Sequence, residues 1–243
     1  VKEYTGFGVS TFLAMRGDFP KGQTGTNGAF DHGNELIAFL RSSFPEIELA
    51  GACYPEKHLD APDMDTELKV MLLKQEAGAD FLVSQLCHDL DNFFRYRDMA
   101  RRGGVVIPMD FGLMPVLAKN PTINMALSRN GCVMDRSLCE IISRNWIFPN
   151  PFEKEVTDAD AAGKKARFRE EGIQYTIRQI DAYRASGVDG IHLYSLNKFD
   201  DVAFSLPLNT VSDPVLTKFG YHLVLVTKKI PATQAADGRP AEP

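Results

Sequence analysis

Apolar runs of strand length alternate with amphipathic runs of helix length along most of the chain. The apolar runs are bounded by turn residues, as buried strands are, and cover residues 9–16, 47–54, 80–86, 105–116 and 188–196. The helix-like runs cover residues 33–44, 64–79, 91–104, a stretch ending near Arg144, and 160–187. Repeated strand-then-helix units imply a parallel sheet with right-handed crossovers. The sequence therefore predicts an α/β fold with five parallel strands.

Two architectures are compatible with five such units in 243 residues. One is an open, doubly wound sheet. The other is a (β/α)8 TIM-type barrel, for which about 250 residues is typical. This barrel would be N-terminally incomplete, with about five of its eight β/α units. The chain begins at Val1, inside a helix-like run, so we expect it to be part of a longer protein.

The alternation of strands and helices stops after residue 205. The segment "VSDPVLTKFGYHLVLVTKK" predicts a turn and one alternating strand, and "IPATQAADGRPAEP" predicts a disordered tail. We therefore expect two parts, the partial barrel over residues 1–205 and an extra tail over residues 206–243.

Composition narrows the classes of partner. The chain is 44% hydrophobic and 24% charged, which is ordinary for a globular protein. A net charge of −5, with no block of Lys or Arg, argues against nucleic acid or an anionic membrane as the main partner. The four cysteines show no CxxC spacing, no apolar run approaches about 18 residues, and no signal-peptide pattern is present. We therefore expect a cytoplasmic protein with reduced thiols and no membrane contact.

Polar residues stand at the carboxyl ends of the apolar runs, where α/β folds place their chemistry. They are Arg16, Gly17 and Asp18 at the end of the first run, Tyr54, Glu56 and His58 at the end of the second, Gln85 at the end of the third, and residues 194–198 at the end of the last. Glu67 and Lys74 stand seven residues apart and so share one face of the helix after the second run. The sequence thus predicts a polar site at one end of the sheet.

Each of these groups also has a structural interpretation. The segment Arg16–Asp18 can form a surface ion pair, and Tyr54–His58 can hold a packed aromatic residue and a satisfied loop histidine. Glu67 and Lys74 can form a solvated helix face. Gln85 has few structural reasons to stand at a strand end, which favours a functional role.

Six segments, in this order and spacing, resemble methylenetetrahydrofolate reductase. They are "LAMRGDFPKG", "HGNELIAFLR", "GACYPEKH", "LLKQEAGADFLVSQL", "GLMPV" and "HLYSLN". The resemblance covers roughly residues 8–205. The resemblance implies a (β/α)8 barrel that binds FAD at the carboxyl ends of its strands. It also implies that hydride passes from NADH or NADPH to the flavin and then to 5,10-methylenetetrahydrofolate. The product would be 5-methyltetrahydrofolate.

The resemblance also assigns roles to residues by position. It implies that FAD is bound by Arg16, Gly17, Asp18, His32, Gly33, Tyr54, His58, Glu67 and Lys74. It places the Asp18 carboxylate beside the isoalloxazine and the folate as the catalytic residue that tunes the flavin. It places Gln85, Met125 and Lys198 on the substrate side. Met125 stands where the family has an aromatic residue that stacks on the nicotinamide, and Lys198 stands where it usually has an Arg for the folate glutamate.

The chain departs from the family pattern most clearly in its acid chemistry. The family's general acid is a Glu in a Glu-Phe-Phe-Pro-Pro type motif on the first barrel strand, and no such motif occurs here. Opening the methylene bridge of the folate needs a general acid. The alternative functions are therefore a non-catalytic or truncated homologue that binds flavin or folate or acts as a partner subunit, and an incomplete gene product. Because relatives are commonly multimeric, we also expect a homo-oligomer.

The tail carries a second, shorter resemblance. Within residues 206–229, the segment "DPVLTKFGYHLVLV" resembles the last strand region of parvulin-type prolyl isomerases. It covers a fraction of that small domain and includes no complete active site.

Overall fold

The computed structural model describes residues 1–17, 28, 30–128, 132–146 and 160–194, and the backbone of 215–217 and 220–222. The chain divides into two units, one of Gly8–Tyr194 and the other of Val1–Phe7 with Ser195–Pro243. The second unit contains helix α1 (Lys2–Gly6) and the antiparallel strands β6 (Val215–Thr217) and β7 (Gly220–His222). Where the sequence predicted one strand in the tail, the described backbone forms two.

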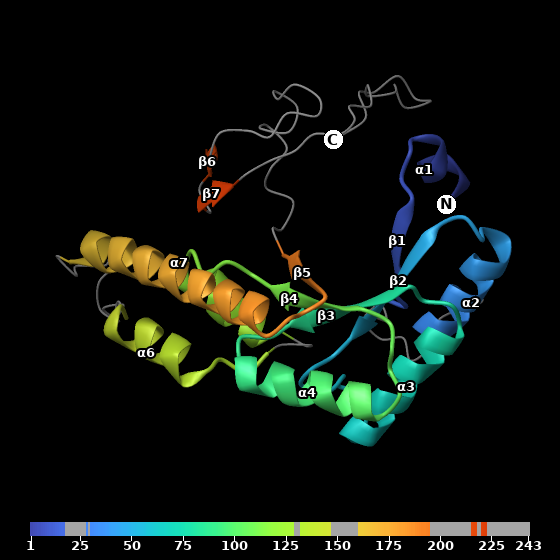
Figure 1. Cartoon of the computed structure of the whole chain (residues 1–243). Coiled ribbons are helices and arrows are strands. Elements are labelled where there is room, and N and C mark those ends of the chain that lie inside the picture. The colour runs from blue at the N-terminus through green and yellow to red at the C-terminus, as the bar shows by residue number, and fades with distance from the viewer. Residues whose placement is uncertain are drawn as a thin grey trace. The chain divides into compact units, whose positions relative to one another are not determined.

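The larger unit contains the predicted parallel sheet (Figure 1). Its strands are β1 (Thr11–Ala14), β2 (Glu48–Cys53), β3 (Phe81–Leu86), β4 (Met109–Leu113) and β5 (Gly190–Leu193). Each strand falls within one of the five apolar runs. All four neighbouring pairs are parallel, and the spatial order β1-β2-β3-β4-β5 follows the chain. A doubly wound sheet reverses its order at a switch point, so the sequential order is that of a partial barrel wall.

The helices follow the strands as predicted, with one difference. They are α2 (Gly33–Ser43), α3 (Met64–Glu76), α4 (Leu90–Arg102), α5 (Lys119–Ala126), α6 (Arg136–Arg144) and α7 (Ala161–Ala185). The stretch predicted to end near Arg144 contains two helices, α5 and α6. Aspartates at 63, 89 and 135 begin α3, α4 and α6, because each side chain accepts a hydrogen bond from the amide three residues later.

The core lies between the sheet and the helices, on one face of the strands. Gly51, Leu82 and Met109 are linked through the strand register and therefore share a face. A Cβ at Gly51 would meet side chains of α2 and α3, and the cluster of Leu82 and Met109 includes residues of α3 and α4. A second cluster joins α4, β4 and α7 through Phe93 and Tyr183, whose rings lie 4.3 and 3.6 Å from that of Phe111. The helices therefore cover one face, as they do in a barrel.

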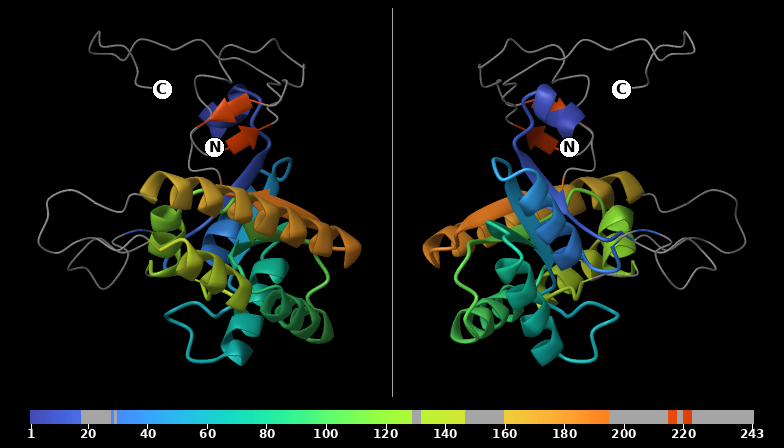
Figure 2. Two further views of the ribbon diagram at one scale, coloured as in Figure 1. Left: turned by 90° about the vertical axis from the view of Figure 1, so that its left-hand side faces the viewer. Right: turned by 90° about the vertical axis from the view of Figure 1, so that its right-hand side faces the viewer.

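Helices α6 and α7 pack side by side (Figures 1 and 2). Their contact is apolar and includes Leu138, Ile141 and Phe168. At Gly172, α7 also meets the chain that follows β4. A Cβ at this position would lie 2.0 Å from the carbonyl oxygen of Val116, so the missing side chain sets how closely the helix can approach.

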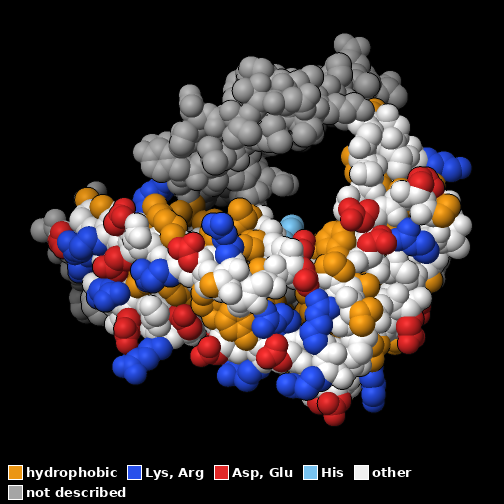
Figure 3. Space-filling model, viewed as in Figure 1, with side chains coloured by type: hydrophobic (Ala, Val, Ile, Leu, Met, Phe, Trp, Pro, Cys, Tyr) orange, Lys and Arg blue, Asp and Glu red, His pale blue; other side chains and the backbone are white. Residues whose placement is uncertain are grey.

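The surface of the described residues is mixed in charge. In the view of Figure 3, Lys and Arg side chains alternate with Asp and Glu side chains, and no large area of one sign appears among the described residues of that face. In the part of the chain that the structure describes, no helix is both long enough and apolar enough to cross a membrane.

Candidate functional site

A tight loop follows the carboxyl end of β2 and carries two of the predicted site residues. Lys57 has a φ of 72°, the one positive φ of a non-glycine residue among the described residues. Its amide donates to the carbonyl of Tyr54 at 2.9 Å, which closes a turn. The turn places the rings of Tyr54 and His58 edge to face, with their centroids 4.6 Å apart. The loop thus presents an aromatic pair at the strand end.

The side chain of Glu67 on α3 accepts hydrogen bonds from this loop. Its side chain is buried, with 1% of the residue exposed. Oε1 accepts from the amide of Tyr54 at 3.1 Å, and Oε2 accepts from the amide of His58 at 3.4 Å. Burial raises the pKa of the Glu67 carboxyl, while the charge of Lys74 and the two amides oppose that rise. One carboxylate therefore fixes both ends of the turn.

Lys74 is the buried cation of the same helix, with 7% of the residue exposed. Its Nζ donates to the carbonyl of Ala52 at 2.5 Å and lies 6.0 Å from the centroid of the Tyr54 ring. Burial lowers the pKa of Lys74, and the charge of Glu67 opposes this shift. The interpretation of Glu67 and Lys74 as a solvated helix face is therefore wrong, because both side chains lie inside the protein.

Arg16, after β1, is joined to the β2 loop by an ion pair. Its Nη2 lies 3.0 Å from Oδ2 of Asp60. The amide of Asp60 donates to Nδ1 of His58 at 3.1 Å. Gly17 follows with a φ of 78°, a conformation that glycine adopts without strain. Arg16 does form an ion pair, as the structural interpretation proposed, but its partner is Asp60, which the sequence did not single out.

The first turn of α2 completes the group. A Cβ at Gly33 would lie 3.6 Å from the carbonyl oxygen of Ala14 and 3.8 Å from Cε of Lys74. His32 is exposed, and its amide donates to the Glu35 carboxylate at 3.2 Å. We call the residues gathered at the ends of β1 and β2 the β1–β2 site: Arg16, Gly17, Gly33, Tyr54, His58, Glu67 and Lys74.

The predicted substrate-side residues lie elsewhere or outside the described residues. Gln85 is half-buried on β3, and its Oε1 accepts from the amide of Leu86 at 2.9 Å. Met125 on α5 packs on a cluster of Leu86, Met114 and Cys132. We call these four residues the β3–α5 cluster. Asp18 and Lys198 lie outside the described residues.

Sequence reasoning missed the carboxylate of Asp60, the contacts of Glu56 and the burial of one histidine. Asp60 links Arg16 to His58, and Glu56, which the sequence placed among the strand-end residues, reaches from the β2 loop to residues after β3 and α5. The available signal for Asp60 was its place in the loop that carries Tyr54 and His58. His88, after β3, is fully buried, and neither of its ring nitrogens has a hydrogen-bond partner within the described ranges. Burial lowers the pKa of His88 to about 4.

The described ranges contain no group of three His, Cys, Asp or Glu side chains placed to hold a metal ion. Within these ranges the chemistry available at the strand ends consists of cations, carboxylates and aromatic rings. Such groups bind anions and flat rings through charge pairing and stacking.

A parallel sheet in chain order, helices on one face, and polar side chains at adjacent strand ends define an α/β protein of the (β/α)-barrel class. The family model of methylenetetrahydrofolate reductase matches residues 1–204. The chain belongs to this family. The comparisons give no support to the parvulin-type resemblance of residues 206–229.

Curated relatives carry the same name. "Methylenetetrahydrofolate reductase 1" of Schizosaccharomyces pombe is 28% identical over 193 residues, which cover 78% of this chain and 29% of the relative. "Methylenetetrahydrofolate reductase 2" of Saccharomyces cerevisiae is 35% identical over 115 residues, 45% of this chain and 19% of the relative. "5,10-Methylenetetrahydrofolate reductase" of Escherichia coli is 26% identical over 115 residues, 47% of this chain and 38% of the relative. The chain therefore spans less than half the length of each.

Proposed function

We propose that this chain binds FAD at the β1–β2 site and serves the reduction of 5,10-methylenetetrahydrofolate to 5-methyltetrahydrofolate with NADH or NADPH. When bound, the flavin supplies two-electron chemistry, taking hydride from the nicotinamide and giving it to the folate. The observation that carries the proposal is that Glu67 and Lys74 are buried next to the aromatic pair of Tyr54 and His58. Glu67 accepts from both amides of the pair, and Lys74 lies 6.0 Å from the Tyr54 ring. Family membership supports the general reaction.

The residues of the β1–β2 site fit the chemical character of FAD. Arg16 and Lys74 bring two positive charges to adjacent strand ends, as the two phosphates of a dinucleotide require. Tyr54 and His58 provide ring faces and edges beside them. Gly33 leaves the space next to Lys74 without a side chain. We assign His32 to the same site on the resemblance alone.

The site's own contacts prepare it for an anionic ligand. Glu67 holds the amides at both ends of the turn, so the Tyr54–His58 loop is ordered without help from a ligand. Asp60 holds the guanidinium of Arg16, and the carbonyl of Ala52 holds the ammonium of Lys74. Groups fixed in advance lose less conformational entropy on binding, which strengthens affinity.

The substrate-side assignments extend this proposal. Asp18 would place a carboxylate beside the isoalloxazine and the folate, where charge tunes flavin reactivity. Gln85 would hydrogen-bond the folate or the nicotinamide, and Met125 would take the place of the family's stacking aromatic. Lys198 would pair with the folate glutamate. We further propose a cytoplasmic homo-oligomer, which the buried free thiols of Cys53, Cys87 and Cys132 support for the compartment.

A second candidate function is a homologue that binds flavin or folate, or acts as a partner subunit, without turnover. It is favoured by departures from the family pattern within this sequence: Met125 stands where the resemblance implies a stacking aromatic residue, and Lys198 stands where it implies an Arg. Where the homologue binds flavin, only the folate reaction separates the two candidates; where it binds folate alone or acts as a partner subunit, flavin retention already separates them.

The test is the visible absorption spectrum of the purified chain, before and after addition of FAD and desalting. We expect retained flavin bands, bleaching by NADH, and slower reoxidation without 5,10-methylenetetrahydrofolate than with it. Lys74→Met should weaken FAD binding about tenfold or more, because it removes a charged partner of the phosphates. Lys69→Met is the matched control, since Lys69 is an exposed lysine of the same helix. A colourless wild-type chain would refute the proposal, and bleaching without folate turnover would favour the binding homologue.

A further inference from the structure

Glu56 stands in the middle of the β2 loop, and its side chain contacts residues outside the β1–β2 site. The left-handed conformation of Lys57 turns the chain directly after it. On one side of the turn, the amides of Tyr54 and His58 bond to Glu67. The Glu56 carboxylate instead contacts the connections that follow β3 and α5.

Its contacts come from two segments, one running from the end of β3 into α4 and the other lying between α5 and α6. Oε2 accepts from the amide of Val133 at 2.5 Å, and Oε1 lies 3.8 Å from Sγ of Cys87 as an acceptor. The side chain of Asn92, in the first turn of α4, also hydrogen-bonds to Glu56. Burial and the nearby charge of Asp89 raise the pKa of Glu56, while these hydrogen bonds oppose the rise. A half-buried carboxylate thus joins three loops at the same end of the sheet.

The segment that Glu56 holds continues into the β3–α5 cluster. Cys132, next to Val133, is buried against Leu86 and Met114, and Met125 packs on the same cluster. Leu86 in turn donates its amide to the side chain of Gln85. The sheet holds Leu86 beside β2, and the bond between Glu56 and Val133 holds the Cys132 side of the cluster to the β2 loop.

We propose that Glu56 is a positioning residue that ties the loop of Tyr54 and His58 to the Cys132–Val133 segment, and so fixes the β3–α5 cluster against the β1–β2 site. The functional meaning of this tie rests on the proposed function, in which the two groups serve the flavin and the substrate. The tie itself is a property of the free chain.

Hydrogen exchange on the flavin-free protein tests the tie directly. Glu56→Ala removes the acceptor, so exchange at the Val133 amide should become at least about threefold faster. Glu56→Gln keeps the length of the side chain and one acceptor oxygen, and should restore slow exchange. Glu35→Ala is the matched control: Glu35 accepts from the amides of Asp31 and His32 at 2.7 and 3.2 Å. It should speed exchange there and leave Val133 unchanged.

A second readout separates positioning from general loosening. In the flavin-loaded protein, Glu56→Ala should raise the KM for 5,10-methylenetetrahydrofolate about threefold or more with FAD retention unchanged, and Glu56→Gln should recover it. Unchanged exchange at Val133 in Glu56→Ala, or a Glu56→Gln protein that exchanges as fast as Glu56→Ala, would overturn the proposal. A wild-type chain that retains no flavin would refute only the proposed function, because the exchange experiment needs no ligand.

Discussion

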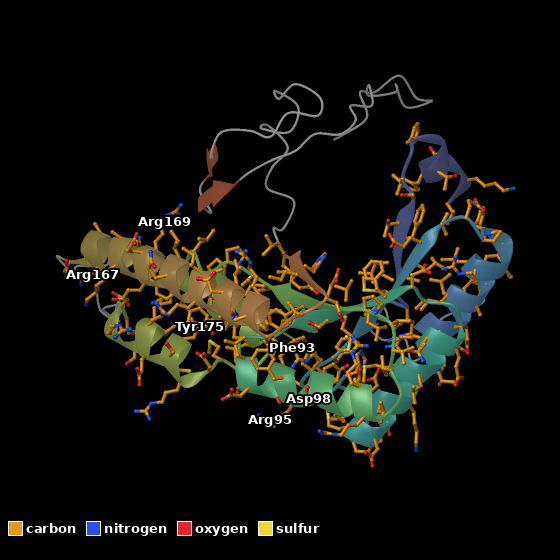
Figure 4. The ribbon with its side chains drawn as sticks, viewed as in Figure 1. Phe93, Arg95, Asp98, Arg167, Arg169 and Tyr175 are labelled. Atoms are coloured by element: carbon orange, nitrogen blue, oxygen red, sulfur yellow. The ribbon has the colours of Figure 1, made fainter. Side chains whose placement is uncertain are left out.

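Acid sensitivity centred on His88 is the prediction that the structure defines most fully. His88 is fully buried in the loop after β3. Its carbonyl accepts from the hydroxyl of Tyr175 at 2.8 Å and from Nε2 of Gln179 at 2.7 Å, both from α7. Figure 4 shows Tyr175 of α7 and, from α4, Phe93. The backbone of His88 is satisfied, but within the described residues its ring nitrogens are not, so a proton on the ring would be a buried charge without a partner.

The size and sign of the effect follow from the two pKa values. Burial lowers the pKa of His88 to about 4 in the folded chain, whereas an unfolded histidine titrates near 6.5. As the pH falls, the unfolded chain takes up the proton first, so this contribution to stability is complete above about pH 6.5 and is lost as the pH falls toward 4. The loss is about 2 kcal/mol at pH 5 and about 3 kcal/mol below pH 4.

Urea denaturation of the wild type and of His88→Phe, at about pH 7.5 and about pH 5, measures this contribution. The carboxylates are common to both proteins, so the loss of stability between the two pH values should be about 2 kcal/mol smaller in His88→Phe. Phe93→Leu is the control, because it also alters a buried side chain and should lower stability equally at both pH values. An equal pH dependence in the wild type and His88→Phe would show that His88 is not a buried, unpartnered base.

Three further predictions test other parts of the molecule. Asp18→Asn should slow folate reduction more than flavin reduction by NAD(P)H, as two half-reactions followed by flavin absorbance would show; equal, negligible effects would exclude the assigned role. Lys198→Ala should raise the folate KM and leave FAD content unchanged, and loss of FAD would indicate a structural defect instead. Gly172→Ala should destabilise the chain by about 1–3 kcal/mol in urea denaturation, because its Cβ would overlap the carbonyl oxygen of Val116; an unchanged midpoint would contradict the close approach of α7.

The fold was largely predictable because each strand is a short apolar run between turns. The five runs contain the five strands, and the sequential order of the sheet settles the choice between barrel and doubly wound architecture. The separation of α5 from α6 was not predicted, although Asp135 is a helix-capping residue with Leu138 three positions on. The cap is a local signal, and it was hidden within a longer helix-like stretch.

For the candidate site, the sequence could predict which residues share a helix face, but not whether that face is buried or which groups it contacts. Spacing placed Glu67 and Lys74 on one side of α3, but a charged pair has the same sequence pattern whether it faces water or the core. Their burial depends on β2, which supplies the carbonyl of Ala52 and the amide of Tyr54. The role of Asp60 depends likewise on how the β2 loop folds against Arg16. Such partners are brought together by the tertiary structure, and no periodic pattern in the sequence indicates them.

The contact of Gly172 with Val116 also has a genetic consequence. No other amino acid lacks a Cβ, so no missense change at this codon is conservative, however small the encoded residue. Its neighbours Glu170 and Gln174 are exposed, and a saturation screen should recover many alleles at those codons. At codon 172 the same screen should return far fewer missense alleles, and those mainly to the smallest residues, so this position would stand out within an otherwise permissive stretch of the gene.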